Sequence, residues 1–372
     1  MINEERVLKE FLEFIQIPCS SFKEREIADI LIKRLSDLGF SIEEDDAGKK
    51  LGGDTGNIVA TRKGNIASAP MIMLTAHMDC VEPCTNVKPQ IKDGLITTDG
   101  TTILGGDDKA GVVAILEALR VIEEKQLPHG DLQVVFTIAE EKGVQGSKNM
   151  DASLLKAKHG FTFDTSGSPG RIVRKAPGQN KLKLVVTGKA AHAGNAPEKG
   201  VNSIIAAGKI LAKFPQGRID DETTCNIGTI TGGSATNVVA ETTTVMLEAR
   251  SRVKSKLDKL TQDIVAIFEE GGKETGTQVE VTVLPAYDPF DLAEDCETIQ
   301  IASKAAEKLG FPVNVVESGG GSDASFFNAF GVPTTVLGVG MTNVHTKNEC
   351  ILEKDLYDSA RLALQIIQEV AK

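Results

Sequence analysis

The sequence has no tryptophan and only 2 tyrosines among its 372 residues. Few aromatic rings are therefore available to stack on nucleic-acid bases or on sugars. The chain also lacks a basic excess, since its formal net charge at pH 7 is −11. Nucleic acids and anionic membranes both require basic patches, so neither is expected as a partner. No apolar run approaches the roughly 20 residues that cross a bilayer.

The cysteines contain no Cys-x-x-Cys pair, and the Cys80/Cys84 spacing fits no zinc finger. We therefore expect all 6 to be reduced thiols, most of them buried. Residues 1–6 are acidic and lead into an amphipathic pattern. That pattern predicts a first helix rather than a secretory signal, which begins with basic residues and a solid apolar stretch. We accordingly expect a cytoplasmic protein.

Several short apolar runs end in polar side chains. Such runs, rich in Val, Ile, Leu and Phe, are typical of strands buried on both faces of a mostly parallel sheet. The predicted strands cover residues 71–76, 132–138, 160–163 and 333–339. Helices are predicted over residues 24–38, 109–124, 298–309 and 353–370. The alternation of strands and helices predicts an α/β domain with helices on both faces of the sheet.

The middle of the chain has a different pattern. Strands are predicted over residues 181–186, 225–230, 242–249 and 278–284, and helices over 201–214 and 256–270. This β-α-β-β-α-β order is the ferredoxin-like α+β plan with an antiparallel sheet. We therefore expect an inserted domain at residues 177–287, within an α/β domain formed by residues 1–176 and 288–372.

Charged side chains follow the predicted strands at their carboxyl ends. In an open α/β sheet, ligands bind beyond these ends. The residues concerned are His77, Asp79, Glu140, Glu141, Asp164 and, after a short loop, His345; Asp107 joins them from the glycine-rich loop 104–111. So many carboxylates in one crevice would repel each other, and a divalent cation relieves that repulsion. The sequence thus predicts a metal site.

The mixture of imidazole and carboxylate suits zinc, and manganese or cobalt is an alternative. Asp79 is placed to accept the other ring N–H of His77 and so to orient it. Glu140 and Glu141 are adjacent and cannot point the same way on an extended chain, so one can bind metal while the other serves as a base. Each motif alone also has a structural explanation, such as a solvated turn or an acidic helix cap. His129 and His159 are expected on the surface.

Six motifs together resemble the co-catalytic zinc exopeptidase family, the group of peptidase T, carboxypeptidase G and aminoacylase. They are HMDC (77–80), GGDDKAG (105–111), AEEKGVQGS (139–147), FDTSG (163–167), AAHAG (190–194) and VHTKNE (344–349). The resemblance covers nearly the whole chain, and within the group it is greatest to the peptidase T type, the tripeptide aminopeptidases. It implies a catalytic metal-binding domain with an inserted lid. It is also compatible with a homodimer, because lids of this family often pair.

The resemblance implies a role for each charged residue. Two metal ions are held by two sets that share Asp107, namely His77, Asp107 and Asp164 for one ion, and Asp107, Glu141 and His345 for the other. Asp79 orients His77, and Glu140 is the general base that takes a proton from the attacking water and passes it to the leaving amine. A cis peptide bond is expected between Asp107 and Asp108.

The substrate site is also implied by the resemblance. His192 would stabilise the tetrahedral oxyanion, in some members from a partner subunit; its alternative is a surface or capping histidine. Asn237 and Arg250 match lid positions that meet the substrate, although Arg250 could equally be a salt-bridge partner. Loop 319–323, with Gly320 and Ser322, resembles the substrate loop of peptidase T. In this chain Gly319 stands where peptidase T has an arginine.

The predicted function is hydrolysis of a terminal peptide bond in short peptides by a two-metal exopeptidase. Because Gly319 lacks the charged side chain that the arginine of peptidase T provides, strict tripeptide specificity does not follow. A related amidohydrolase acting on dipeptides or N-acyl amino acids is the alternative within the enzymes. The alternative outside them is an inactive homologue that serves as a binding or scaffold protein.

Overall fold

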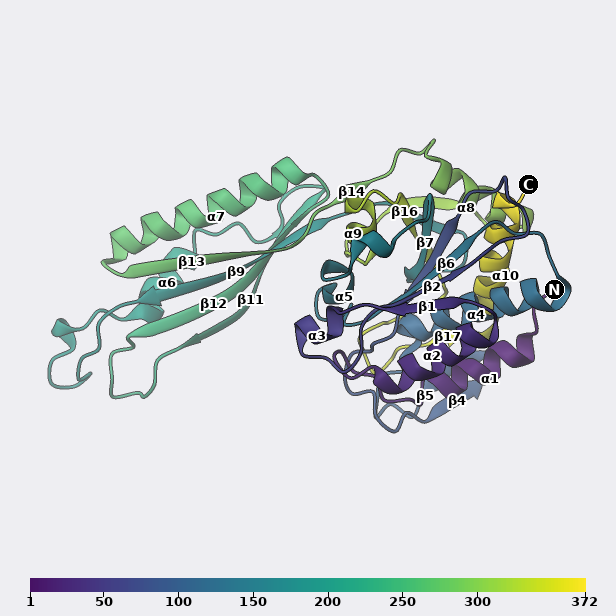
Figure 1. Cartoon of the computed structure of the whole chain (residues 1–372). Coiled ribbons are helices and arrows are strands. Elements are labelled where there is room, and N and C mark those ends of the chain that lie inside the picture. Colours follow the sequence, from purple (N-terminus) through teal and green to yellow (C-terminus); the bar gives the residue numbers. More distant parts are fainter. The chain divides into compact units, whose positions relative to one another are not determined.

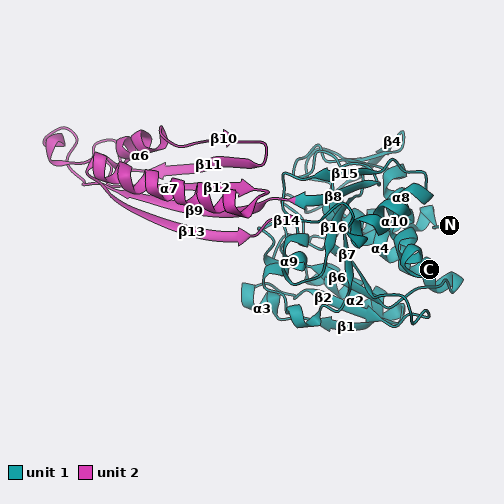
Figure 2. Cartoon of the chain, turned by 90° about the horizontal axis from the view of Figure 1, so that it is seen from above, with its two compact units in different colours: residues 1–175, 291–372 teal, residues 176–290 magenta.

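A nine-stranded sheet runs through the first of two units in the computed structural model, which describes all 372 residues. This unit comprises Met1–Lys175 and Asp291–Lys372 (Figure 2, teal). The strand order is β1 (Ser41–Glu44), β2 (Ile58–Arg62), β6 (Leu132–Thr137), β3 (Ile72–His77), β7 (His159–Thr165), β16 (Thr334–Gly338), β8 (Arg171–Ala176) and β14 (Phe290–Asp291), with β15 (Asn314–Glu317) paired to β8. Strands β6, β3, β7 and β16 run parallel. Their carboxyl ends therefore meet at one edge.

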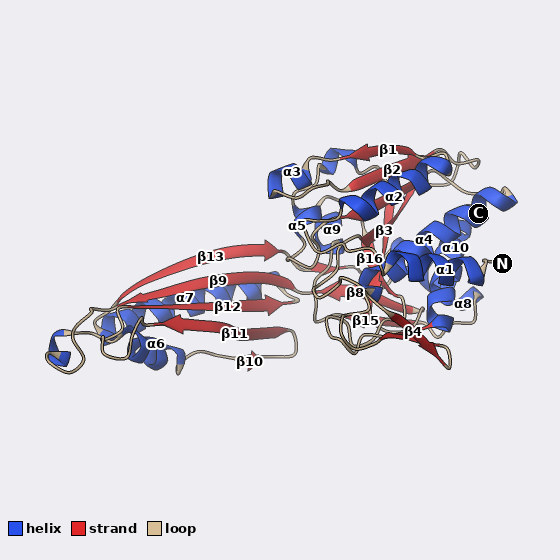
Figure 3. Cartoon of the chain, turned by 90° about the horizontal axis from the view of Figure 1, so that it is seen from below, coloured by secondary structure: helices blue, strands red, loops and turns tan.

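Helices cover both faces of this sheet, which explains why its central strands are mostly apolar and continuously buried. Every residue of β3 and of β6 is buried. Helix α4 (Gly106–Lys125) packs against β3 and β7, and α10 (Glu353–Val370) packs on α4. Figure 3 shows these two helices on one side of the sheet and α9 (Ala324–Ala329) on the other.

The rest of this unit consists of shorter elements around the sheet (Figure 1). The helices are α1 (Glu4–Phe14), α2 (Arg25–Asp37), α3 (Ala47–Leu51), α5 (Gln145–Lys148), α8 (Glu297–Lys308) and the 3-10 helix η1 (Ala152–Leu154). A three-stranded sheet contains β17 (Ile351–Leu352), β5 (Leu95–Thr98) and β4 (Pro89–Lys92). None of the helices combines the length and the apolarity needed to cross a membrane.

The second unit, Ala176–Phe290, is a five-stranded antiparallel sheet with two helices (Figure 2, magenta). The elements are β9 (Gly178–Thr187), the 3-10 helix η2 (Pro197–Lys199), α6 (Ser203–Leu211), β10 (Gly217–Arg218), β11 (Thr223–Gly232), β12 (Thr242–Ser251), α7 (Lys254–Thr275) and β13 (Gln278–Tyr287). Alternate residues of β9 (Leu182, Leu184) are buried and form one core with Ile264 and Phe268 of α7. This alternation of apolar and polar residues is expected of a sheet covered on one face.

The predicted fold class is confirmed: a mixed, mostly parallel sheet flanked by helices, with an inserted α+β unit built on a small antiparallel sheet. The expected surface positions of His129 and His159 are wrong, since each is only 3% exposed. His159 is the first residue of β7, and its Nδ1 lies 2.9 Å from Thr298 Oγ1 on α8. The turn residues beside these histidines predicted exposure, but packing of distant segments covers them.

Candidate metal centre

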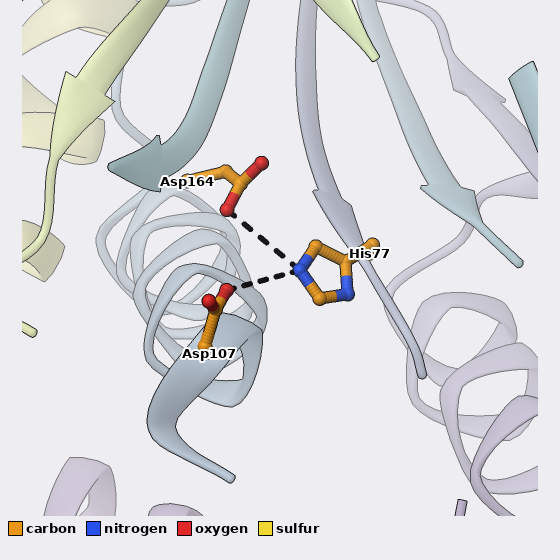
Figure 4. A group of neighbouring side chains, drawn as sticks. All are labelled: His77, Asp107 and Asp164. Carbon is orange, nitrogen blue, oxygen red and sulfur yellow. Dashed lines mark hydrogen bonds and ion pairs between the residues drawn. The ribbon is translucent and has the colours of Figure 1, made fainter. Parts of the chain in front are cut away.

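The final residue of β3, His77, points its ring across the carboxyl edge of the sheet. The side chain is 2% exposed. Its Nε2 lies 3.0 Å from Asp107 Oδ1 and 3.7 Å from Asp164 Oδ1 (Figure 4). On the other side of the ring, Nδ1 lies 3.1 Å from the backbone oxygen of Asp79 and 3.3 Å from its Oδ1. The Asp79 contacts therefore leave Nε2 facing the two other carboxylates.

Asp107 lies at the start of α4, where the backbone is not yet helical. Its φ and ψ are −80° and 102°, and the bond to Asp108 is cis, as the resemblance implied. Asp108 caps the following turn, because its Oδ1 accepts the Gly111 N–H at 3.1 Å. The interpretation of this motif as an acidic helix cap therefore holds for Asp108, while Asp107 remains directed at the histidines.

A second group of ligand atoms meets on the other oxygen of Asp107. His345 Nε2 lies 3.2 Å from Asp107 Oδ2 and 3.0 Å from Glu141 Oε2. His345 follows β16 through a short loop and has a positive φ of 63°. The structure thus brings the five predicted ligands into two groups that share Asp107, and the ligand atoms within each group lie within 4.8 Å of one another.

The residues present fit divalent cations. Burial raises the pKa of Asp164 well above its usual range. The charge of His77 opposes this shift, and the neighbouring carboxylates add to it. Contacts with Asp107 and Glu141 raise the pKa of His345 to about 10. Glu141 Oε1 is buried and has no hydrogen-bond partner. Cations between these carboxylates would offset their repulsion and occupy the unpaired oxygen.

Glu140 lies next to both groups, since its carboxylate is within 4.8 Å of ligand atoms of His77 and Glu141. Burial raises its pKa well above the usual range, and the charges of Asp323 and Glu141 act in the same direction. The Asp79 carboxylate accepts the backbone N–H groups of Glu140 at 3.0 Å and of Glu141 at 3.2 Å. Asp79 therefore positions this turn as well as the His77 ring.

Two supporting carboxylates and one hydroxyl are not among the predicted site residues. Ser21 donates to Asp79 Oδ2 at 2.6 Å. Glu24 Oε1 accepts the Ala139 N–H at 3.0 Å, and burial raises the pKa of Glu24 to about 8. Glu349, in the VHTKNE motif, accepts the Asp107 N–H at 2.9 Å, and burial raises its pKa to about 7. Of these three residues only Glu349 lies in one of the six motifs, and no motif indicates which group each side chain contacts.

Asp323 fastens the predicted substrate loop to the sheet. It is 1% exposed, accepts a hydrogen bond from Thr137 at the end of β6, and accepts another from Ser147 Oγ at 2.5 Å. The neighbouring Gly320 is exposed, whereas Ser322 is 5% exposed and its Oγ accepts the Ala324 N–H at 3.2 Å. Gly320 is therefore the more accessible of the two predicted substrate contacts.

The remaining predicted residues belong to the second unit. His192 and Asn237 are exposed, and the Asn237 oxygen accepts the Ala193 N–H at 2.9 Å. His192 Nδ1 accepts the N–H groups of Gly194 and Asn195, both at 3.1 Å, so the ring proton resides on Nε2. Arg250 is half-buried and pairs with Glu248 through Nε to Oε1 at 2.9 Å. That pair matches the salt-bridge alternative for Arg250.

Comparison with known proteins identifies the chain's relatives. The profile of peptidase family M20/M25/M40 matches residues 73–369. The chain belongs to this family. The predicted family resemblance is thereby confirmed, and the M20 fold accounts for both units.

Three relatives of this M20 chain are similar over essentially their whole length. The uncharacterized protein YqjE of Bacillus subtilis is 42% identical over 372 residues, 100% of both chains. The solved aminopeptidase PepT of Bacillus cereus has a TM-score of 0.92 at 42% identity, covering 100% of both chains. The solved tripeptidase of Staphylococcus aureus has a TM-score of 0.96 at 42% identity, covering 100% of this chain and 99% of that one.

Proposed function

We propose that the protein is a two-metal exopeptidase that hydrolyses a terminal peptide bond of short peptides, in the manner of a tripeptide aminopeptidase. The observation that carries the proposal is the pair of three-residue ligand groups sharing Asp107. The similarity to an aminopeptidase and to a tripeptidase, both at 42% identity, supports the peptide substrate.

The two groups would hold one ion each, and their imidazole and carboxylate ligands favour zinc over manganese or cobalt. Two such ions, when bound, would polarise the scissile carbonyl and lower the pKa of the attacking water. Asp107 would contribute one oxygen to each group, since Oδ1 faces His77 and Oδ2 faces His345.

Glu140 acts as the general base in this proposal. It takes the proton of the attacking water and delivers it to the leaving amine. Asp79 holds the Glu140 backbone N–H at 3.0 Å, which limits the positions that the base can take.

His192 is assigned to the developing oxyanion. Because its Nδ1 is occupied as an acceptor, the Nε2–H is the group that donates to a negatively charged oxygen. Asn237, Arg250, Gly320 and Ser322 are assigned to substrate contacts on the family resemblance. In that role Arg250 would contact the substrate while it remains paired with Glu248.

The experiment is a substrate panel on protein reconstituted with zinc. We expect cleavage of tripeptides with a free α-amine and no cleavage of the same peptides after N-acetylation. Hydrolysis of N-acyl amino acids or dipeptides instead would establish the amidohydrolase alternative. Gly319, at the position where peptidase T has an arginine, means that strict tripeptide specificity does not follow from the resemblance. Failure to hydrolyse any member with zinc, manganese or cobalt would contradict both and favour a binding protein.

A further inference from the structure

Three cysteines gather beside the segment that carries His77 and Asp79. Cys19, Cys80 and Cys84 are 0%, 3% and 4% exposed, and all are free thiols. The Sγ atoms of Cys19 and Cys80 lie 3.4 Å apart. This contact joins positions 61 residues apart in the sequence. The proposed hydrolysis uses none of these thiols.

The backbone holds the two thiols together. The Cys80 N–H donates to the Cys19 oxygen at 2.9 Å, and the neighbouring Ser20 forms a parallel β-bridge with Cys80. A disulfide has an S–S distance of about 2.05 Å, so closing the pair needs a sulfur movement of about 1.4 Å. Because the backbones are already paired, side-chain rotation and a small local shift supply that movement.

We propose that Cys19 and Cys80 form an oxidation site, which hydroperoxides convert to a disulfide through Cys84. Cys80 follows Asp79 directly in the chain, so forming the disulfide disturbs the metal centre. This second statement rests on the proposed function, whereas the disulfide itself does not.

Cys84 is the thiol at which oxidation begins. Its interaction with Cys80 lowers the pKa of Cys84 to about 7, although burial opposes this, whereas the pKa values of Cys80 and Cys19 are raised, so Cys84 is the thiol of the three that ionises most readily. The thiolate attacks the peroxide, the O–O bond breaks, and Cys84 becomes a sulfenic acid with release of an alkoxide or hydroxide. The Cys80 thiol then forms an S–S bond to Cys84 and releases water.

Thiol–disulfide exchange moves the bond to the buried pair. Cys19 gives its proton to the alkoxide or hydroxide released in the first step and attacks the Cys80 sulfur as the thiolate, and Cys84 leaves as its thiolate. A thiol of lower pKa is the better leaving group, and the contact with Cys80, together with burial, raises the pKa of Cys19 while that of Cys84 is lowered. In the sum, two thiols lose two electrons and two protons, and one peroxide is reduced to water and an alcohol, or to two waters.

The disulfide would act on Asp79 from both sides. Cys80 follows Asp79 directly, and Cys19 lies two residues before Ser21, whose hydroxyl donates to Asp79 at 2.6 Å. Lys109, fully buried, donates to the Met78 oxygen at 2.6 Å and contacts Cys80 Sγ at 3.3 Å. Moving the sulfur therefore breaks contacts that fix this segment, and with it the Asp79 carboxylate beside His77.

The test oxidises the full-length protein loaded with zinc, which has no redox chemistry of its own. Hydrogen peroxide is added, and the disulfides are mapped by mass spectrometry of peptides prepared without reductant. We expect a Cys19–Cys80 link, while Cys19→Ser stops at a Cys80–Cys84 link. The matched control, Cys225→Ser in the core of the second unit, should give the Cys19–Cys80 link unchanged.

Two outcomes would overturn the proposal. Sulfinic acid at Cys84 as the final product of the wild-type protein, with no Cys19–Cys80 link, would exclude the oxidation site. A link that forms without effect on hydrolysis or zinc affinity would exclude the coupling to Asp79, for which we expect about a tenfold or larger loss, reversed by dithiothreitol. Since the mapping needs no turnover, failure of the proposed hydrolysis would be recognised separately.

Discussion

Glu349 accepts the backbone N–H of Asp107 at 2.9 Å, although the two residues are 242 positions apart in the chain. Its second oxygen accepts the Gly105 N–H at 2.8 Å, and the side chain is buried. The residue shared by both ligand groups is therefore held in place by a carboxylate from the loop that also supplies His345. This relationship leads to the first of four predictions.

Glu349→Gln should weaken metal binding. The amide retains one acceptor oxygen but presents an NH₂ group to the second backbone N–H, so one of the two hydrogen bonds is lost. We expect a loss of about 10–100-fold in metal affinity, as is usual for groups that support ligands. Titration against a competing chelator measures it, with Glu307→Gln on the exposed side of α8 as control. Equal affinities of both variants would contradict the role of Glu349.

Glu140→Ala should separate metal binding from catalysis. The alanine variant loses the base but keeps both ligand groups, so we expect a normal metal content and a rate at least ~10²-fold lower. Elemental analysis and steady-state kinetics on the best substrate of the panel give the two quantities. Turnover at the wild-type rate would show that Glu140 is not the base.

Substitutions of Asp107 and Asp164 should differ in metal stoichiometry. Asp107 belongs to both ligand groups, so Asp107→Ala should lose both ions, whereas Asp164→Ala should lose one. Elemental analysis after dialysis against trace zinc measures ions per chain. Asp93→Ala, in the exposed turn between β4 and β5, is the control and should keep two. Equal losses in the Asp107 and Asp164 variants would argue against a shared ligand.

Glu24 should make the stability of the fold depend on pH. Burial and the charge of Asp79 raise the pKa of Glu24 from 4.5 to about 8, so the folded chain keeps this proton after the unfolded chain has lost it. The stabilisation from this group is complete below pH 4.5, falls as the pH rises towards 8, and is absent above it. The slope is at most about 1.4 kcal/mol per pH unit.

Glu24→Gln removes this titration and keeps an acceptor for the Ala139 N–H. The free energy of unfolding of the variant, relative to wild type, should therefore increase between pH 5 and pH 8. Urea denaturation in the presence of a chelator measures it. The exposed neighbour Glu26 offers the control Glu26→Gln, whose difference from wild type should be flat. Parallel pH curves for Glu24→Gln and wild type would refute the assignment.

A local sequence pattern predicts those helices and strands whose own residues favour the structure that they adopt. Residues 132–138 are mostly apolar, interrupted only by Gln133 and Thr137, and every residue of β6 is buried, as expected for a strand covered on both faces. The helix predicted over 353–370 corresponds to α10, because apolar residues recur on one face. Short edge strands such as β15 were not predicted, because their formation depends on pairing with β8 rather than on their own composition.

By itself, the sequence determined the two-unit α/β plan and the residues whose side chains meet at the sheet edge, because periodicity and strand ends are local properties of the chain. Only the tertiary structure decided which side chains support the residues at that edge. Ser21 reaches Asp79 across 58 residues, and Glu24 reaches Ala139 across 115. The proximity of Cys19 to Cys80 belongs to the same class. Such contacts depend on how distant segments pack, and the spacing of residues in the sequence does not show which of them meet.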